Sequence, residues 1–169
     1  MVILGIDPGL AATGYGIIEA QADRMRLIAA GDIRPPQAAP LAERLSVLHA
    51  AMAELITGHR PDVAVLEKIF THHAHVTTAA LMAHARGVVC LAVQQQGMTL
   101  AEYLPTHIKK SLTGRGRASK EQVARMVSQW VHVDAAWSSD ATDALALAIV
   151  HALALAQHQR LGGVVALRA

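Results

Sequence analysis

The spacing of apolar residues changes at Leu41, and this change constrains the fold more than any other feature of the chain. After Leu41, apolar side chains recur every three or four residues as far as Ile56, which predicts an amphipathic helix with Gly58 as its stop signal. Before Leu41, short apolar segments alternate with turn residues, as in consecutive β-strands: Val2–Ile6, Tyr15–Glu19 and Met25–Arg34. The chain is therefore expected to begin with three strands and then a helix.

The rest of the chain alternates between strand and helix patterns. Val63–Leu66 and Met98–Tyr103 are predicted strands, and an Ala-rich helix is predicted between them over Val76–Gln96. Three further helices are expected: Pro105–Leu112, Ser119–Trp130 and Ser139–His158. This order predicts an α/β fold, in which a mixed five-stranded sheet is flanked by helices, with an α+β arrangement as the alternative.

Size and composition exclude several classes of protein. The 169 residues correspond to one domain, and 53% apolar against 17% charged residues exclude a disordered chain. Five aromatic residues are too few for an RNA-binding sheet of interleaved aromatics. The single Cys90 lies in an apolar run, which predicts a reducing compartment and a buried thiol. The longest apolar stretch, Ala144–Ala156, is too short to cross a bilayer, so we expect a cytoplasmic protein without membrane contact.

Four acidic residues stand at positions where an unpaired charge is unfavourable. Asp7 and Glu67 each end an apolar strand, and Asp140 and Asp143 lie three residues apart at the start of a helix, hence on one face. Convergent carboxylates without Cys or His suit Mg²⁺ or Mn²⁺. Each acid also has a structural explanation: a turn at Asp7, a pairing of Glu67 with Lys68, or a favourable helix dipole at Asp140.

Basic residues gather between positions 107 and 125, where the only acid is Glu121. The group comprises Lys109, Lys110, Arg115, Arg117, Lys120 and Arg125. Such a cluster attracts phosphate groups. Taken alone, however, it is more typical of a solvated helical face with ordinary surface charge.

Taken together, three sequence segments resemble the RuvC family of Holliday-junction resolvases. They are Gly5-Ile6-Asp7-Pro8-Gly9 with Thr13-Gly14-Tyr15-Gly16, Glu67-Lys68-Ile69-Phe70, and Asp140-Ala141-Thr142-Asp143-Ala144-Leu145-Ala146. The resemblance implies a ribonuclease-H-like nuclease domain over residues 1–158 and a short tail over residues 159–169. It also implies a homodimer that cuts two strands of a four-way DNA junction symmetrically, together with RuvA and RuvB as partners.

Several residue roles follow from the same resemblance. Asp7, Glu67, Asp140 and Asp143 match the catalytic positions, Lys109 and Lys120 match basic positions near the scissile phosphate, and Gly114-Arg115-Gly116 matches a basic glycine-bearing segment. Phe70 matches an aromatic residue implicated in stacking on bases near the crossover, with a buried structural phenylalanine as the alternative. The loop with His72, His73 and His75 departs from the family pattern, so the preferred cleavage sequence is not carried over; phosphate contact or exposure to solvent is favoured there over a zinc site.

The expected reaction is metal-dependent hydrolysis of a phosphodiester that leaves a 5′-phosphate and a 3′-hydroxyl. Two Mg²⁺ or Mn²⁺ ions per subunit, about 3.5–4 Å apart, would activate the attacking water and stabilise the leaving oxygen. Asp7 is expected to bridge both ions, Glu67 and Asp140 to bind one each, and Asp143 to complete the shell.

Three other functions compete with this interpretation. One is a ribonuclease-H-like nuclease that acts on structured RNA, and another is a junction-binding protein without catalysis. The third is an actin-like sugar kinase, whose phosphate loop resembles the Asp7 segment, although 169 residues cannot supply the second domain that such kinases need.

Overall fold

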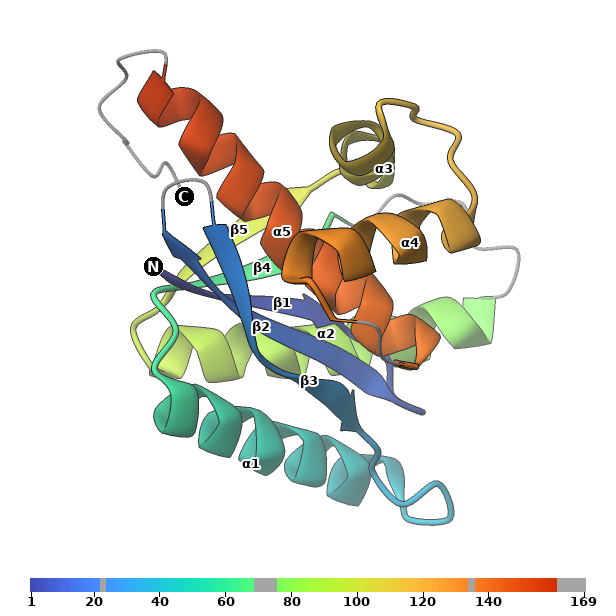
Figure 1. The fold of residues 1–169 in the computed structure, drawn as a ribbon. Helices are drawn as coiled ribbons and strands as arrows, with labels where there is room; N and C mark the ends of the chain where they lie inside the picture. The colour runs from blue at the N-terminus through green and yellow to red at the C-terminus, as the bar shows by residue number, and fades with distance from the viewer. Residues whose placement is uncertain (22–23, 69–75, 134–135, 161–169) are drawn as a thin grey trace.

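The computed structural model describes residues 1–21, 24–68, 76–133 and 136–160 (Figure 1). Its elements in chain order are β1 (Val2–Asp7), β2 (Thr13–Gln21), β3 (Arg24–Ile33), α1 (Leu41–His59), β4 (Val63–Glu67), α2 (Val76–Gln95), β5 (Thr99–Tyr103), α3 (Pro105–Thr113), α4 (Lys120–Val131) and α5 (Ser139–Arg160). Every strand and helix expected from the sequence is confirmed.

Several helix ends differ from expectation by a few residues, most clearly those of α1 and α5. α1 ends at His59 and not at Gly58, because Arg60 adopts the left-handed conformation (φ 46°) and its backbone N–H donates to the Ile56 carbonyl. α5 continues two residues into the expected C-terminal tail, to Arg160. The tail beyond Arg160 lies outside the described residues, as do Phe70 and the loop that contains His72, His73 and His75.

The strands form the expected mixed five-stranded sheet, in the order β3-β2-β1-β4-β5. β1 and β3 pair with β2 in antiparallel orientation, while β4 pairs in parallel with β1 and β5. A parallel pair needs a crossover connection, and α1 and α2 supply those crossovers. The central position of β1 follows because it pairs with β2 on one side and with β4 on the other.

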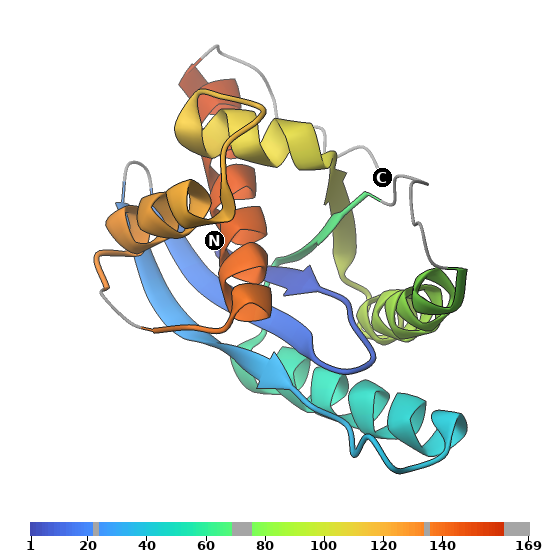
Figure 2. The same cartoon turned by 90° about the vertical axis from the view of Figure 1, so that its right-hand side faces the viewer.

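Helices cover both faces of the sheet (Figures 1 and 2). α5 crosses one face with α3 and α4 beside it, and the core there contains residues such as Ile18, Val65 and Leu147. α1 and α2 cover the opposite face, over a core that includes Leu4, Met52 and Val89. The alternating residues of β1 thus serve two cores, which agrees with its continuous apolar sequence.

Two glycines of β2 allow α5 to lie directly on the sheet. A Cβ atom on Gly14 would come within 2.1 Å of the Asp140 carbonyl oxygen, and one on Gly16 within 2.6 Å of the Leu145 side chain. Gly14 and Gly16 alternate along the strand, so they lie on the same face. Their lack of side chains determines how closely the start of α5 approaches the sheet.

Two helices in the described residues are long and apolar enough to cross a membrane by length and composition alone, α2 and α5. α5 meets this criterion because it is a core helix of the sheet, as many soluble proteins have. α2 is mostly exposed and carries Leu81, Met82 and Leu91 on its surface. Cys90 on this helix is partly exposed, which corrects the expectation of a buried thiol, because only one side of α2 packs on the sheet.

Candidate active site

Asp7 and Glu67 lie at the same edge of the sheet. Each is the last residue of its strand, β1 for Asp7 and β4 for Glu67. These strands are parallel neighbours, and their register pairs Ile6 with Leu66, the residues just before the two acids. The strand pairing therefore brings together two carboxylates that are sixty positions apart in sequence.

Asp140 and Asp143 are presented by the first turns of α5. Ser138 caps this helix: its hydroxyl accepts a hydrogen bond from the Ala141 backbone N–H at 3.0 Å and donates one to Asp32 Oδ1 on β3 at 2.6 Å. Because Ser138 supplies the cap, Asp140 is not needed for it. The bond to Asp32 also ties the start of α5 to the sheet.

The four carboxylates influence one another electrostatically. The pKa of Asp7 is raised to about 7, first by burial and then by the negative charges of Asp143, Asp140 and Glu67, against the lowering effect of the Lys120 ammonium. Burial and the Asp143 charge likewise raise the pKa of Glu67, against the opposing effects of Lys109, Lys120 and Arg86. Within the described part of the chain, no hydrogen bond reaches the Asp7 carboxylate. The negative charge of the four carboxylates therefore exceeds the positive charge of the cations near them.

Asp7, Glu67 and Asp143 line a cleft of about 250 Å³ together with Lys109 and Lys120. Its other lining residues come from α3, α4 and the first half of α5. Lys120 Nζ lies 3.4 Å from Asp143 Oδ2 and 3.2 Å from Ser139 Oγ, and its side chain is 73% exposed. Asp140 does not line the cleft, although its charge acts on Asp7.

The carboxylates suit a hard cation by chemistry but do not yet surround one. Among the residues with described positions, no three His, Cys, Asp or Glu side chains are close enough together to hold a metal ion. Oxygen donors that are buried and short of hydrogen bonds fit Mg²⁺ or Mn²⁺ by their chemistry.

A larger hollow of about 650 Å³ lies elsewhere, between the β2–β3 hairpin and the C-terminal half of α4. Among the described residues that line it, the one acid, Glu19, is already bound by Arg26 through two hydrogen bonds. That hollow therefore lacks the uncompensated negative charge of the carboxylate cleft.

Comparison with known proteins identifies the family. The model of the family described as "Crossover junction endodeoxyribonuclease RuvC" matches residues 3–151, which is most of the chain. The chain belongs to the RuvC family. RuvC proteins of Azorhizobium caulinodans and Paramagnetospirillum magneticum are each 45% identical to it, over 150 and 166 residues, and these alignments cover 89% and 98% of this chain and 88% and 99% of the relatives.

Solved structures agree with the RuvC assignment. Thermus thermophilus RuvC in complex with a Holliday junction substrate superimposes with a TM-score of 0.86 at 31% identity, covering 93% of this chain and 96% of that one. The yeast mitochondrial Holliday junction resolvase shares the fold alone, with a TM-score of 0.67 at 12% identity over 95% of this chain and 82% of the yeast chain. The expected ribonuclease-H-like fold is thereby confirmed.

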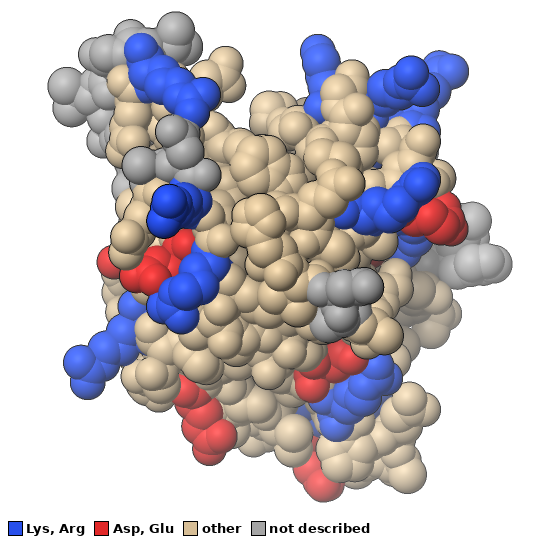
Figure 3. Space-filling model, viewed as in Figure 1, with Lys and Arg blue, Asp and Glu red and all other residues tan. Residues whose placement is uncertain are grey.

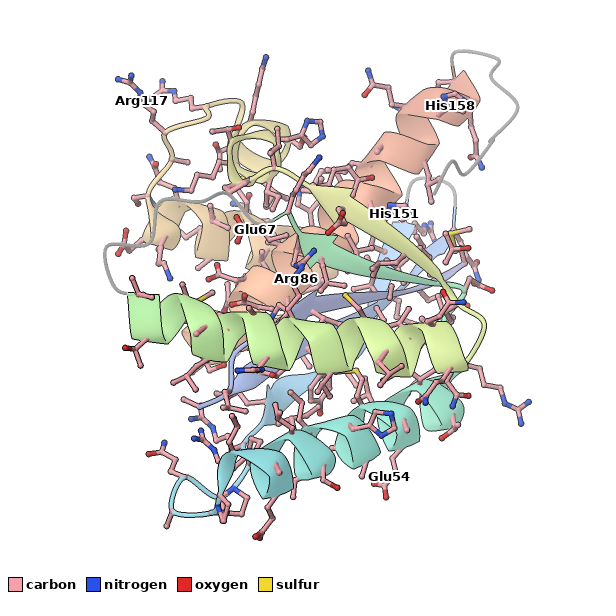
Figure 4. The ribbon with its side chains drawn as sticks, turned by 180° about the vertical axis from the view of Figure 1, so that it is seen from behind. Glu54, Glu67, Arg86, Arg117, His151 and His158 are labelled. Carbon is pink, nitrogen blue, oxygen red and sulfur yellow. The ribbon has the colours of Figure 1, made fainter. Side chains whose placement is uncertain are left out.

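The basic residues expected for this RuvC family member divide into two groups. Lys109 and Lys120 line the carboxylate cleft, whereas Arg115 lines a separate hollow with Arg125 on the outer side of α4. Figure 4 shows Arg117 at the outer edge of the molecule, away from Glu67. Neither Lys110 nor Arg117 is among the residues that line the cleft.

The residues that position the acids were not predicted from the sequence. Gly14 and Gly16 were considered only as part of the segment Thr13-Gly14-Tyr15-Gly16. Glycines at alternate positions of a strand indicate that another backbone approaches closely, so they could have predicted the contact with α5. Thr13 is fully buried, and its hydroxyl donates to the Gly9 carbonyl at 2.7 Å, which closes the loop after Asp7. Nothing in the sequence pattern marked Arg86 as a neighbour of Glu67.

Proposed function

We propose that this chain is an endonuclease that resolves four-way DNA junctions in recombination and repair. It cuts two strands symmetrically by metal-dependent phosphodiester hydrolysis and leaves 5′-phosphate and 3′-hydroxyl ends. The observation that carries the proposal is the cleft in which Asp7, Glu67 and Asp143 face Lys109 and Lys120, in a chain of the RuvC family. Its relatives are named crossover junction endodeoxyribonucleases, and the Thermus thermophilus protein is described in complex with a Holliday junction.

The RuvC family is one of metal-dependent nucleases, and we propose Mg²⁺ or Mn²⁺, two ions per subunit, as the metal here. Asp7, Glu67, Asp140 and Asp143 are the residues that would hold them. When bound, the ions would lower the pKa of the attacking water and neutralise charge on the leaving oxygen. Asp7 is central because its carboxylate interacts electrostatically with all three other acids.

The lysines of the cleft act on the substrate. Lys109 and Lys120 come from different helices and line the same cleft as the carboxylates. Their positive charges attract the scissile phosphodiester and hold it next to the carboxylates. Lys110, Arg115 and Arg117 contact phosphates of the junction arms farther out. Each of these contacts positions the DNA without reading its sequence.

Phe70 is proposed to stack on a base at the opened crossover, three residues beyond the end of β4. Stacking of a base on an aromatic ring contributes about 1–3 kcal/mol. Phe70→Ala is therefore expected to reduce junction cleavage far more than the melting temperature. If stability and activity fall together, Phe70 belongs to the core.

A homodimer is the assembly that matches a junction with two equivalent strands, because a two-fold pair supplies one site for each cut. α2 is the proposed interface, since its apolar residues Val76, Leu81, Met82 and Leu91 are exposed at 84%, 37%, 37% and 51%. RuvA and RuvB are the proposed partners in branch migration, and the cytoplasm is the proposed location.

The decisive test is incubation of the chain with a synthetic four-way junction and Mg²⁺ or Mn²⁺, followed by separation of the strands on a gel. Paired, symmetric nicks are expected in the junction and none in a linear duplex of the same sequence. Structured RNA and ATP serve as competing substrates. Preferential cleavage of the RNA would support the alternative nuclease, and junction binding without any cut would support a non-catalytic protein.

A further inference from the structure

The side chain of Arg86 extends from α2 to the end of β4. It lies on the sheet face opposite α5, yet Figure 4 shows it directed toward the end of the strand that carries Glu67. Its Nη1 donates to the backbone carbonyl of Glu67 at 2.7 Å, and its Nη2 forms an ion pair with Glu102 on β5. The Arg86 side chain is only 14% exposed, and its contact with the Glu67 carbonyl is partly buried, whereas Glu102 is 40% exposed.

The carbonyl of Glu67 needs this donor because the sheet does not provide one. The pairing between β1 and β4 ends at Ile6 and Leu66, one residue before Glu67. On the other side, the Lys68 N–H continues the ladder to Tyr103 at 2.8 Å. The Glu67 carbonyl points away from that ladder, so the guanidinium takes the place of a missing strand neighbour.

A guanidinium is suited to this task because it holds two acceptors at fixed angles. One terminal nitrogen of Arg86 donates to the Glu67 carbonyl, and the other binds the Glu102 carboxylate. The bond to Glu102, on β5, holds the Arg86 side chain in place. The Lys ammonium is a compact point charge without such a fork. The peptide plane of Glu67, and with it the direction of its side chain, is thereby tied to α2.

We infer that Arg86 is a positioning residue for the junction-cleaving reaction: its hydrogen bond to the Glu67 backbone sets the Glu67 carboxylate at the angle needed to share a divalent ion with Asp7. The inference rests on the proposed function. Partners of this kind, one step removed from a ligand, typically change metal affinity or activity by about 10–100-fold when replaced. Nothing in this role requires Arg86 to touch the DNA.

The test compares Arg86→Lys and Arg86→Gln with the wild-type chain in single-turnover cleavage of a four-way junction at several Mg²⁺ concentrations. Both variants are expected to cut about tenfold or more slowly and to need about tenfold more Mg²⁺ for half-maximal rate. Junction affinity, measured in Ca²⁺, is expected to stay within about twofold, since Arg86 holds no phosphate. Glu102→Gln is expected to shift the rate and the Mg²⁺ requirement in the same direction but less, because it weakens the partner that fixes Arg86. Glu54→Gln on the exposed side of α1 is the control and is expected to behave as the wild type does.

A second readout separates positioning from general stability. Arg86→Ala, supplied with guanidinium chloride at millimolar concentration, is expected to regain part of its cleavage rate, whereas urea at the same concentration restores none. Wild-type rates and Mg²⁺ dependence in Arg86→Lys would overturn the inference. So would a loss of cleavage that follows the melting temperature across the variants without a change in Mg²⁺ dependence. A wild-type chain that cuts no junction would instead overturn the proposed function.

Discussion

Gly5 on β1 lies so close to α5 that a Cβ atom on this residue would stand 1.9 Å from the Ala144 carbonyl oxygen. Ala144 directly follows Asp143 in the helix. The distance between β1 and α5 therefore also sets the distance between Asp7, two residues after Gly5, and the acid that faces it from the helix.

Gly5→Ala is expected to push α5 away from the sheet. Overpacking of this kind costs about 1–3 kcal/mol or more, because the atoms that the new Cβ would meet, in Ala144 and Ala148, belong to the main chain and cannot rotate away. Junction cleavage should fall more steeply than stability, since the acids separate. The matched control is Gly58→Ala in α1, where a Cβ meets nothing within 4 Å, so stability should hold or rise. Wild-type cleavage by Gly5→Ala would contradict the account of the site.

Asp7→Asn and Asp143→Asn test the carboxylates directly. The amide preserves volume but removes the charge that a divalent cation requires, so cleavage should be abolished while junction binding survives. Glu54→Gln on the exposed side of α1 is the control, and it should cut as the wild type does. Gel assays of cleavage and band-shift assays of binding measure the two properties separately. Cleavage by Asp7→Asn in Mg²⁺ would reject the site.

The raised pKa of Asp7 makes the stability of the metal-free chain depend on pH. The folded chain holds the Asp7 proton up to about pH 7, against an ordinary value of 3.8. The stabilisation from that proton is complete below the ordinary pKa and is lost as the pH rises through about 7. In EDTA, the melting temperature of the wild type should fall between pH 5.5 and pH 8 relative to that of Asp7→Asn.

Burial lowers the pKa of His151, but this affects the wild type and Asp7→Asn equally and cancels in the comparison. Added Mg²⁺ at pH 8 should raise the melting temperature of the wild type and leave that of Asp7→Asn almost unchanged, because a ligand of the folded state stabilises it by mass action. Parallel pH curves for the two proteins would show that Asp7 is not the group responsible.

Lys109→Ala and Lys120→Ala should weaken junction binding and flatten its salt dependence. Each phosphate that a cation neutralises contributes about 0.9 to the slope of log affinity against log salt, so each variant should lose about one unit. Arg24→Ala is the comparison, because this exposed residue lies on β3 outside the cleft. Figure 3 shows that Lys and Arg side chains also occur in separate groups elsewhere on the surface. An unchanged slope would assign both lysines to ordinary surface charge.

Patterns in the amino-acid sequence were sufficient to predict the local elements and the chemical type of the site. Apolar spacing placed every strand and helix to within about two residues, because burial selects period-two and period-3.6 patterns wherever one face meets a core. The pairing of acids with strand ends marked Asp7 and Glu67, since an unpaired charge is costly there. The spacing of Asp140 and Asp143 indicated a shared helix face before any contact was known.

Which side chains come into contact depends on how the elements pack in three dimensions. The parallel register of β1 with β4 brings Asp7 beside Glu67, and the glycine contacts set the depth of α5. The hydrogen bond from Arg86 to the Glu67 carbonyl joins α2 to β4 through a main-chain atom. Because every residue has a main-chain carbonyl, the sequence does not indicate which one accepts this bond. Periodicity reports which side of an element is buried, whereas register and packing depth depend on contacts between segments that are distant along the chain.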